Sequence, residues 1–397
     1  MSEDVLARGK LLLEDAGNSV IPFNRAFLTG AELHYLETAL ASGTLEGDGP
    51  FTARASALLN KMLGAVATLL ATSCSHALDM SALVLDLQPG DEVILPSYTF
   101  PSTANAYALR GAVPVFVDCR PDTINLDERL VEAAVTDRTR AIVAVHYAGV
   151  GCDMDALAGI AERHGLRLIE DNAHGLGATY RGKPLGSFGS LATQSFHSTK
   201  NAHCGEGGAL VINDPDLVLQ AEIIREKGTN RTQYYRGEID RYHWVDLGSS
   251  YLPSELLAAF LTAQLENFDV IQAGRMRVWN AYHDRLAEWA ADNGVAQPVV
   301  PVDRVHPAHL YFLVLPDPAA SAGFRRHLAD LGVQATSHYQ PLHNAPAGLR
   351  FGRTAPGGCP TTERVARQLT RLPLYTGLSD DQVDRIVAAV TSYRVAR

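Results

Sequence analysis

The chain has 397 residues, of which 46% are hydrophobic and 20% charged, so it holds enough apolar side chains for more than one buried core. Its 44 acidic residues outnumber its 34 basic ones, and the net charge of −10 argues against a nucleic-acid-binding surface spread over the chain. Five scattered cysteines without CxxC spacing, no apolar run of about 18 residues and no secretory signal predict a cytoplasmic protein without disulfides, structural zinc or membrane spans.

Residues 1–20 are expected to form an N-terminal extension, with a helical pattern up to residue 18. Short apolar runs with little polar alternation follow, as is typical of strands buried on both faces. These runs cover residues 67–73, 92–97, 113–119, 139–147, 167–172, 192–197 and 208–214. Helical patterns lie between several of them, for example over 154–164 and 216–226. We therefore predict an α/β domain over residues 21–270 with a mainly parallel, seven-stranded sheet.

The pattern changes after Glu255, where a long helical pattern runs to about residue 289. We expect a smaller α+β domain over residues 271–397, hinged near residue 270. Its predicted elements are a strand over 309–315, a helix over 321–331, a strand over 332–339 and a helix over 380–394.

Several well-known functional motifs are missing. The chain has no GxGxxG after the first strand, no GxxxxGK[ST], no HExxH and no GxSxG. These absences disfavour a dinucleotide-binding Rossmann unit, a P-loop NTPase, a zinc protease and an α/β-hydrolase.

Polar residues follow three of the predicted strands, at the sheet edge where ligands bind in parallel α/β proteins. After the first strand, residues 72–76 open a helix with small residues, which suits a phosphate; an ordinary helix cap is the alternative. After the fifth, Asp171 and His174 are placed to orient a cofactor ring, unless they only form a turn. After the sixth, Lys200 precedes a glycine-rich turn; a buried lysine of this kind forms Schiff bases, and a structural lysine is the alternative.

Together the three sites fit pyridoxal phosphate (PLP), with the lysine on its aldehyde and the aspartate on its pyridine nitrogen. With these residues the chain resembles the nucleotide-sugar aminotransferases of the DegT/DnrJ/EryC/StrS type, within the fold-type I PLP enzymes. The resemblance covers about residues 21–393. It rests on Ile21-Pro22-Phe23, the segments 90–100, 170–174, 195–200, 205–208 and 338–343, and Arg371-Leu372-Pro373-Leu374. Segments 225–231 and 246–252 are most similar to the TDP-4-amino-4,6-dideoxygalactose transaminases of that family.

The resemblance implies a role for each matching residue. Lys200 would carry the cofactor as a covalent internal aldimine. Once the amino donor has displaced it, its free amine would move a proton between Cα of the donor, or C4 of the sugar, and C4′ of the cofactor. Asp171 would pair with the pyridine nitrogen, His174 would lie near the phenolic oxygen, and Phe100 would stack on the ring. The phosphate would be held by Ser195 and by the backbone of Cys74 and Ser75, where many relatives have Gly-Thr.

Relatives of this type build each active site across a homodimer interface. The partner's loop 248–252, including Ser250 where many relatives have Asn, and also Arg231 would therefore reach the site. His338 and His343 either line the substrate cleft or are structural. His197, His203 and Cys204 flank Lys200, and their spacing does not favour a metal site.

The predicted reaction is transfer of an amino group from L-glutamate to C4 of a TDP-linked 4-keto-6-deoxyhexose. A 3-keto-sugar or a 4-keto-pentose nucleotide is the alternative acceptor. A catalytically silent, ligand-binding relative that regulates a partner is a third possibility, against which the intact Lys200 and Asp171 argue. Some relatives with histidine in place of the lysine are dehydratases, so Lys200 favours transamination.

Overall fold

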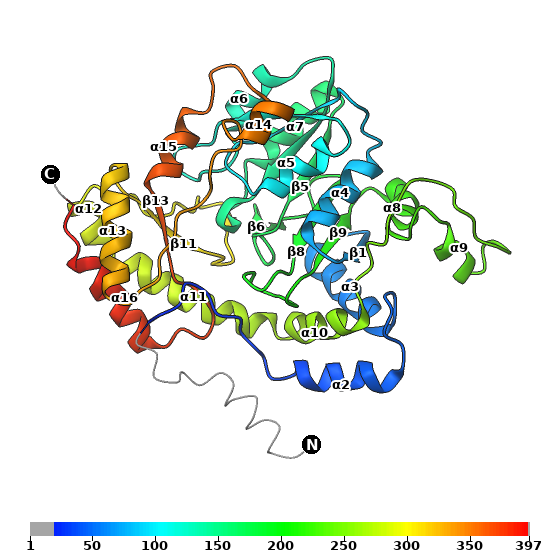
Figure 1. Ribbon diagram of the computed structural model, residues 1–397, viewed down its shortest axis with the longest axis horizontal. Helices are drawn as coiled ribbons and strands as arrows, with labels where there is room; N and C mark the ends of the chain where they lie inside the picture. Colours follow the sequence, from blue (N-terminus) through cyan, green and yellow to red (C-terminus); the bar gives the residue numbers. More distant parts are fainter. Residues whose placement is uncertain (1–19, 396–397) are drawn as a thin grey trace.

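The computed structural model describes residues 20–395 and is built around one eight-stranded sheet (Figure 1). The strand β9 (Gly208–Ile212) runs antiparallel to both of its neighbours, and all other pairs are parallel. The strand order is β1 (Ala67–Ala71), β9, β8 (Leu191–Ser195), β5 (Arg167–Asp171), β4 (Thr139–Val145), β2 (Glu92–Pro96), β3 (Val113–Val117) and β12 (Arg353–Thr354). This confirms the mainly parallel sheet and all seven predicted strands.

The eighth strand, β12, is an addition to the prediction. It comes from the C-terminal third of the chain and pairs with the outer edge of β3 over two residues. The Arg353 guanidinium fixes it by donating two hydrogen bonds to the buried Glu92 carboxylate, at 3.0 and 2.6 Å. Two residues are too few to give a strand pattern in a sequence.

Helices cover both faces of the sheet, which explains why its strands lack polar alternation. On β2, Val93 and Leu95 pack into one core while Ile94 packs into the other. The first core also holds side chains of α4 (Cys74–Val84), α5 (Pro101–Ala108) and α8 (Val218–Arg225), and the second those of α6 (Glu128–Val131) and α7 (Met154–His164). A further core lies between the sheet, α3 (Pro50–Leu63) and α10 (Glu255–Glu266).

The remaining elements lie around this layered body. The α2 helix (Glu32–Ser42) packs beside α10, and the short α9 (Arg231–Tyr235) lies on a projecting segment at the edge of the molecule (Figure 1). A small sheet joins β10 (Arg304–Val305), β6 (Thr179–Tyr180) and β7 (Lys183–Pro184).

The C-terminal part has its own apolar core, on which an antiparallel pair of strands and several helices converge. Its strands are β11 (Tyr311–Val314) and β13 (Leu369–Leu372). Its helices are α11 (Phe268–Arg285), α12 (Ala287–Asp292), α13 (Pro318–Asp330), α14 (Pro346–Phe351), α15 (Pro360–Gln368) and α16 (Asp380–Ser392). The domain division near residue 270 stays a prediction, and α11 continues through that position.

The strand predicted over residues 332–339 is wrong. Val333 forms a single bridge to Ile21, and Thr336 forms another to Arg371 on a different element. A strand needs consecutive pairs on one partner, and this segment changes partner after three residues. The predicted helical extension lies outside the described residues. Within residues 20–395, no helix combines the length and the apolar character that crossing a membrane requires.

Candidate functional site

The carboxyl ends of β1, β5 and β8 meet at one edge of the sheet. Because β9 runs antiparallel to both β1 and β8, these two strands point the same way, and β5 is parallel to β8. In the register, Gly208 pairs with Ala71 on one side and with Ser195 on the other. The three segments singled out in the sequence therefore come together, as strand direction requires.

The helix α4 begins at this edge and presents its N-terminus to it. Its cap residue Ser73 accepts a hydrogen bond from the His76 N–H at 3.1 Å. The N–H groups of Cys74 and Ser75 have no acceptor within the helix, so they and the positive end of the helix dipole are available to an anion. The Ser75 hydroxyl lies 2.6 Å from that of Ser102. A side chain at Gly208 would come within 2.3 Å of the Cys74 nitrogen, so glycine permits the close approach of β9.

Asp171 ends β5 with its carboxylate held in place from two directions. Thr103 on α5 donates a hydrogen bond to Oδ2 at 2.7 Å, and the Ala173 N–H donates to Oδ1 at 3.2 Å. The side chain is 5% exposed. A buried carboxylate of this kind is suited to receive a further N–H donor from a ligand.

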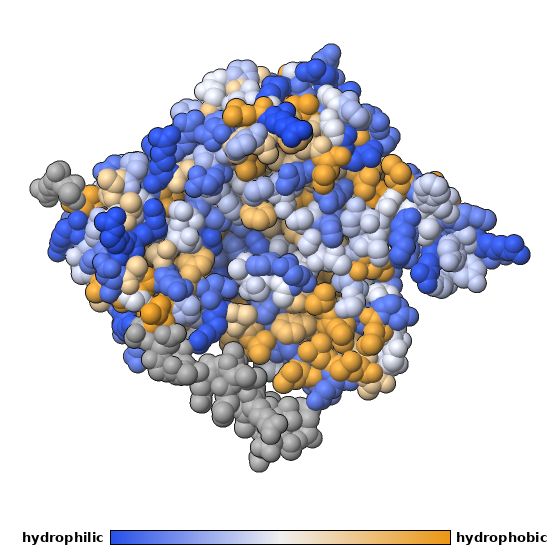
Figure 2. All heavy atoms as spheres, in the orientation of Figure 1, coloured by the Kyte–Doolittle hydropathy of each residue, from blue (hydrophilic) through white to orange (hydrophobic). Residues whose placement is uncertain are grey.

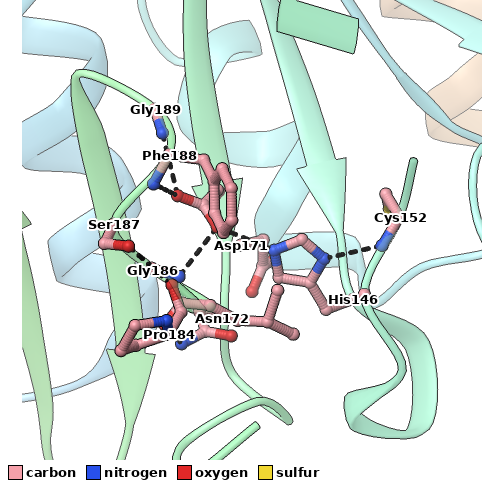
Figure 3. Close-up of polar contacts among 12 residues, drawn as sticks. His146, Cys152, Asp171, Asn172, Pro184, Gly186, Ser187, Phe188 and Gly189 are labelled. Carbon is pink, nitrogen blue, oxygen red and sulfur yellow. Dashed lines mark hydrogen bonds and ion pairs between the residues drawn. The ribbon is translucent and has the colours of Figure 1, made fainter. Parts of the chain in front are cut away.

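The residue before it, Glu170, ties the same strand end to His146 and to the turn 186–189, both of which are labelled in Figure 3. Its fully buried carboxylate accepts hydrogen bonds from the N–H groups of Gly186, Phe188 and Gly189 at 2.6–2.9 Å. His146 Nε2 lies 3.0 Å from the same carboxylate, while its Nδ1 accepts from the Cys152 N–H. Since Nδ1 accepts, the ring proton is on Nε2 and is donated to Glu170.

Lys200 is half-buried beside these groups. The pKa of its amine is lowered to about 8, chiefly because the amine is buried; Cys74 and Asp171 oppose this lowering, and Arg371 adds to it. Cys74 remains a neutral thiol, because burial and Asp171 raise its pKa to about 12. Lys200 Nζ forms no ion pair with the described residues, and with a pKa of about 8 a fraction of the amine is uncharged near neutral pH.

Aromatic rings line the other side of the site. His174 stacks on His309, with ring centroids 4.1 Å apart, and its Nε2 lies 3.5 Å from the Tyr339 hydroxyl. His338 lies 3.1 Å from the Tyr147 hydroxyl through Nδ1. Burial lowers the pKa of all three histidines, and the nearby charge of Lys200 adds to this. The site therefore contains neutral imidazoles next to cationic side chains.

Arg371 on β13 begins the segment Arg371–Leu374, and the sequence alone predicts no role for it. Its positive charge contributes to the lowered pKa of Lys200, His174 and His338. Burial lowers its own pKa, and its Nε is buried without a hydrogen-bond partner. Its guanidinium also lies 4.7 Å from the Phe23 ring centre. An unneutralised guanidinium in a binding site signals an anionic ligand, and that signal needs the structure because the sequence does not show burial.

Four predicted residues lie apart from these contacts. Phe100 is 56% exposed, and its ring centre is 6.3 Å from that of Tyr339. His343 bonds Ser97 and Glu363 through its two ring nitrogens, which anchors its loop to the end of β2. Arg231 is the first residue of α9, on the projecting segment (Figure 1). In this chain Ser250 pairs with Glu226, and Arg231 bonds Tyr235 and Glu226.

The residues brought together match the chemical groups of PLP. The α4 N-terminus offers N–H donors to a phosphate, Asp171 offers an acceptor to a ring N–H, and Lys200 offers an amine to an aldehyde. His174 Nδ1, buried without a partner, leaves a polar atom available at the same place. The donor set therefore fits this cofactor.

Comparison with known proteins agrees with this geometry. The model of the DegT/DnrJ/EryC1/StrS aminotransferase family matches residues 28–391. DesV from S. venezuelae, solved with a ketimine intermediate, is 32% identical with a TM-score of 0.86, over 95% of this chain and 100% of its own. TlmJ, an aminotransferase from Streptoalloteichus hindustanus, is 30% identical with a TM-score of 0.86, over 94% and 98%. Spr1654 from Streptococcus pneumoniae in its PLP form is 26% identical with a TM-score of 0.85, over 94% and 98%.

The family model matches most of the chain, and fold-type I structures align along nearly its whole length. Membership in this family accounts for the sheet, its strand ends and the polar groups that lie there. The chain belongs to the DegT/DnrJ/EryC1/StrS aminotransferase family, and its cofactor is pyridoxal 5′-phosphate.

Proposed function

We propose that the protein transfers an amino group from L-glutamate to C4 of a TDP-linked 4-keto-6-deoxyhexose. The observation that carries the proposal is the pair of Lys200, whose pKa is lowered to about 8, and the buried Asp171 at one sheet edge. When bound there, the cofactor supplies an aldehyde for amine exchange and a ring that accepts electrons from the substrate carbon. The C4 position and the TDP group follow from the resemblance of segments 225–231 and 246–252.

Lys200 has two tasks in this proposal. Its neutral amine bonds to the cofactor, and once the donor amine replaces it, the same amine moves a proton to and from the reacting carbon. The Asp171 carboxylate would accept a hydrogen bond from the ring N–H of the bound cofactor. The hydrogen bond from Thr103 at 2.7 Å holds the carboxylate in position for this.

Arg371 supports glutamate as the amino donor. A half-buried arginine whose Nε is buried without a partner, and which has no acidic partner among the described residues, is suited to bind a carboxylate with two parallel N–H donors. Its charge acts on Lys200, so a carboxylate bound by Arg371 would lie in the same site as that amine. Tyr147, His338 and Tyr339 supply neutral hydrogen-bonding groups, which suit a hydroxylated sugar as the acceptor.

A homodimer completes the site in this proposal. Figure 2 shows hydrophobic atoms gathered over the helices α2 and α10, where Leu33, Leu40 and Leu45 are 47%, 58% and 40% exposed. A patch of this kind marks an interaction surface, and a second copy of the chain is the occupant that we propose. Arg231 and Ser250, which pair with Glu226 in their own chain, would then reach the partner's site.

The test is product analysis with matched acceptors. The purified protein, loaded with PLP and supplied with L-glutamate, is offered TDP-4-keto-6-deoxyglucose, the 3-keto isomer and a 4-keto-pentose nucleotide. We expect amination of the 4-keto-hexose with a kcat/KM about tenfold or more above the others, with one 2-oxoglutarate formed per product, and none with Lys200→Ala. Faster amination of another acceptor would contradict the proposed substrate.

A further inference from the structure

The stacked pair of His174 and His309 joins two distant parts of the chain at the site. His174 follows β5 in the large sheet, whereas His309 lies just before β11. Their planes differ by 23°, and the side chains are only 8% and 5% exposed. Nothing in the sequence pattern singles out His309, which lies in a short apolar run and reads as part of a strand.

The hydrogen bonds of Asn201 fix which nitrogen of His309 carries the proton. The Asn201 Nδ2 donates to the Pro307 carbonyl at 2.7 Å and to Gln272 Oε1 at 2.9 Å. A carbonyl only accepts, so Nδ2 faces Pro307 and Oδ1 faces the other way. Oδ1 lies 3.0 Å from His309 Nδ1, which must therefore be the donor. Since burial and Lys200 lower the pKa of His309, the ring is neutral with its proton on Nδ1.

The backbone immediately before His309 adopts a strained conformation. Ala308 has a φ of +47°, a conformation that side-chain-bearing residues rarely adopt. The buried guanidinium of Arg275 holds it there by donating to the carbonyls of Ala308 and His309, at 3.0 and 2.5 Å. Such strain persists where surrounding contacts fix the backbone, and it concentrates at functional sites.

We propose that His309 is a positioning residue of the active site: bonded to Asn201 and stacked on His174, it fixes the His174 ring and the backbone that follows Lys200. The inference rests on the proposed function of this site. Asn201 is the next residue after Lys200, so one hydrogen bond ties the C-terminal part of the chain to the lysine segment. The stack holds the His174 ring in one plane, which would set the orientation of that ring toward the cofactor.

The test separates the two contacts by substitution. His309→Phe keeps a ring to stack on His174 but removes the donor to Asn201, His309→Asn keeps a donor but removes the ring, and His309→Ala removes both. The readout is the dissociation constant of PLP for the apo-protein. We expect it to rise about tenfold for His309→Ala and less for the other two variants. His283→Phe is the control: it keeps a ring stacked on Trp279 and should bind PLP like the wild type.

A second readout needs neither cofactor nor activity. NMR of the apo-protein labelled with 15N-histidine should show His309, assigned by its loss in His309→Phe, as the neutral tautomer protonated at Nδ1. A proton on Nε2, or PLP affinity within twofold of the wild type for His309→Ala, would overturn the proposal. A wild-type protein that takes up no PLP would instead contradict the proposed function, before any variant is compared.

Discussion

At the scale of single residues, the chemistry depends on how the protein sets the charge of Lys200. Burial removes water from the ammonium and lowers its pKa to about 8, and Arg371 adds electrostatic repulsion. Cys74 and Asp171 raise the pKa of the amine, and they offset this lowering only in part. A lysine in water has a pKa near 10.4 and is almost fully protonated at neutral pH.

This lowered pKa predicts how cofactor uptake depends on pH. Below pH 8 the amine is protonated and cannot attack an aldehyde, and above pH 8 it is neutral. We therefore expect the rate at which the apo-protein bonds PLP to rise with pH, with a midpoint near 8. Stopped-flow absorbance measures this rate. A midpoint above pH 10, as for an exposed lysine, would contradict the assignment.

Arg371 gives a prediction about the amino donor. A hydrogen bond to a charged group contributes about 1.5–3 kcal/mol, or roughly a 10- to 100-fold change in an equilibrium constant. Arg371→Met should raise the KM for L-glutamate by about this factor while leaving PLP affinity within about twofold. Arg367→Met, at an exposed arginine on α15, is the matched control and should change neither constant. An unchanged KM in Arg371→Met would rule out this carboxylate site.

At the scale of elements, the end of β5 is held by the buried carboxylate of Glu170. It has four hydrogen-bond partners, of which three are backbone N–H groups of one turn. Glu170→Gln replaces an acceptor by a donor facing those N–H groups, which leaves buried donors unpaired. We expect the free energy of unfolding to fall by about 3 kcal/mol.

Denaturant unfolding of the apo-protein measures that change. Glu132→Gln is the control, because this carboxylate is half exposed and pairs with Arg163 at the surface. It should lower stability much less than Glu170→Gln does, because solvent screens a surface ion pair. If both substitutions lowered the free energy of unfolding equally, the buried contacts of Glu170 would stabilise the protein no more than a surface ion pair does.

The elements also show how far sequence reasoning reaches. The seven strands were predictable because most of them are buried apolar runs, and α7 because its apolar positions recur at helical spacing. The site segments were predictable from the strands that they follow. The segment 332–339 misled the prediction because its few β-type residues bridge two different partners. Arg371 and His309 gained their roles only from burial and from partners far away in the sequence.

At the scale of the whole molecule, the exposed hydrophobic patch predicts that the protein works as a dimer. Leu40→Asp would place a charge in that patch, and burying an unpaired charge disfavours association. We expect a larger monomer fraction in analytical ultracentrifugation and a loss of activity in proportion. Leu349→Asp, at an exposed leucine of α14, should leave the mass of the assembly unchanged. A monomeric wild type with full activity would contradict shared sites.

The central claim is that Lys200 carries the cofactor, and one measurement tests it most directly. The PLP-loaded protein is reduced with borohydride, digested, and its peptides are analysed by mass spectrometry. The account predicts one modified lysine, Lys200, with no modification in Lys200→Ala and normal modification in the control Lys61→Ala on α3. A label on another lysine, or no label at all in the wild type, would contradict the account.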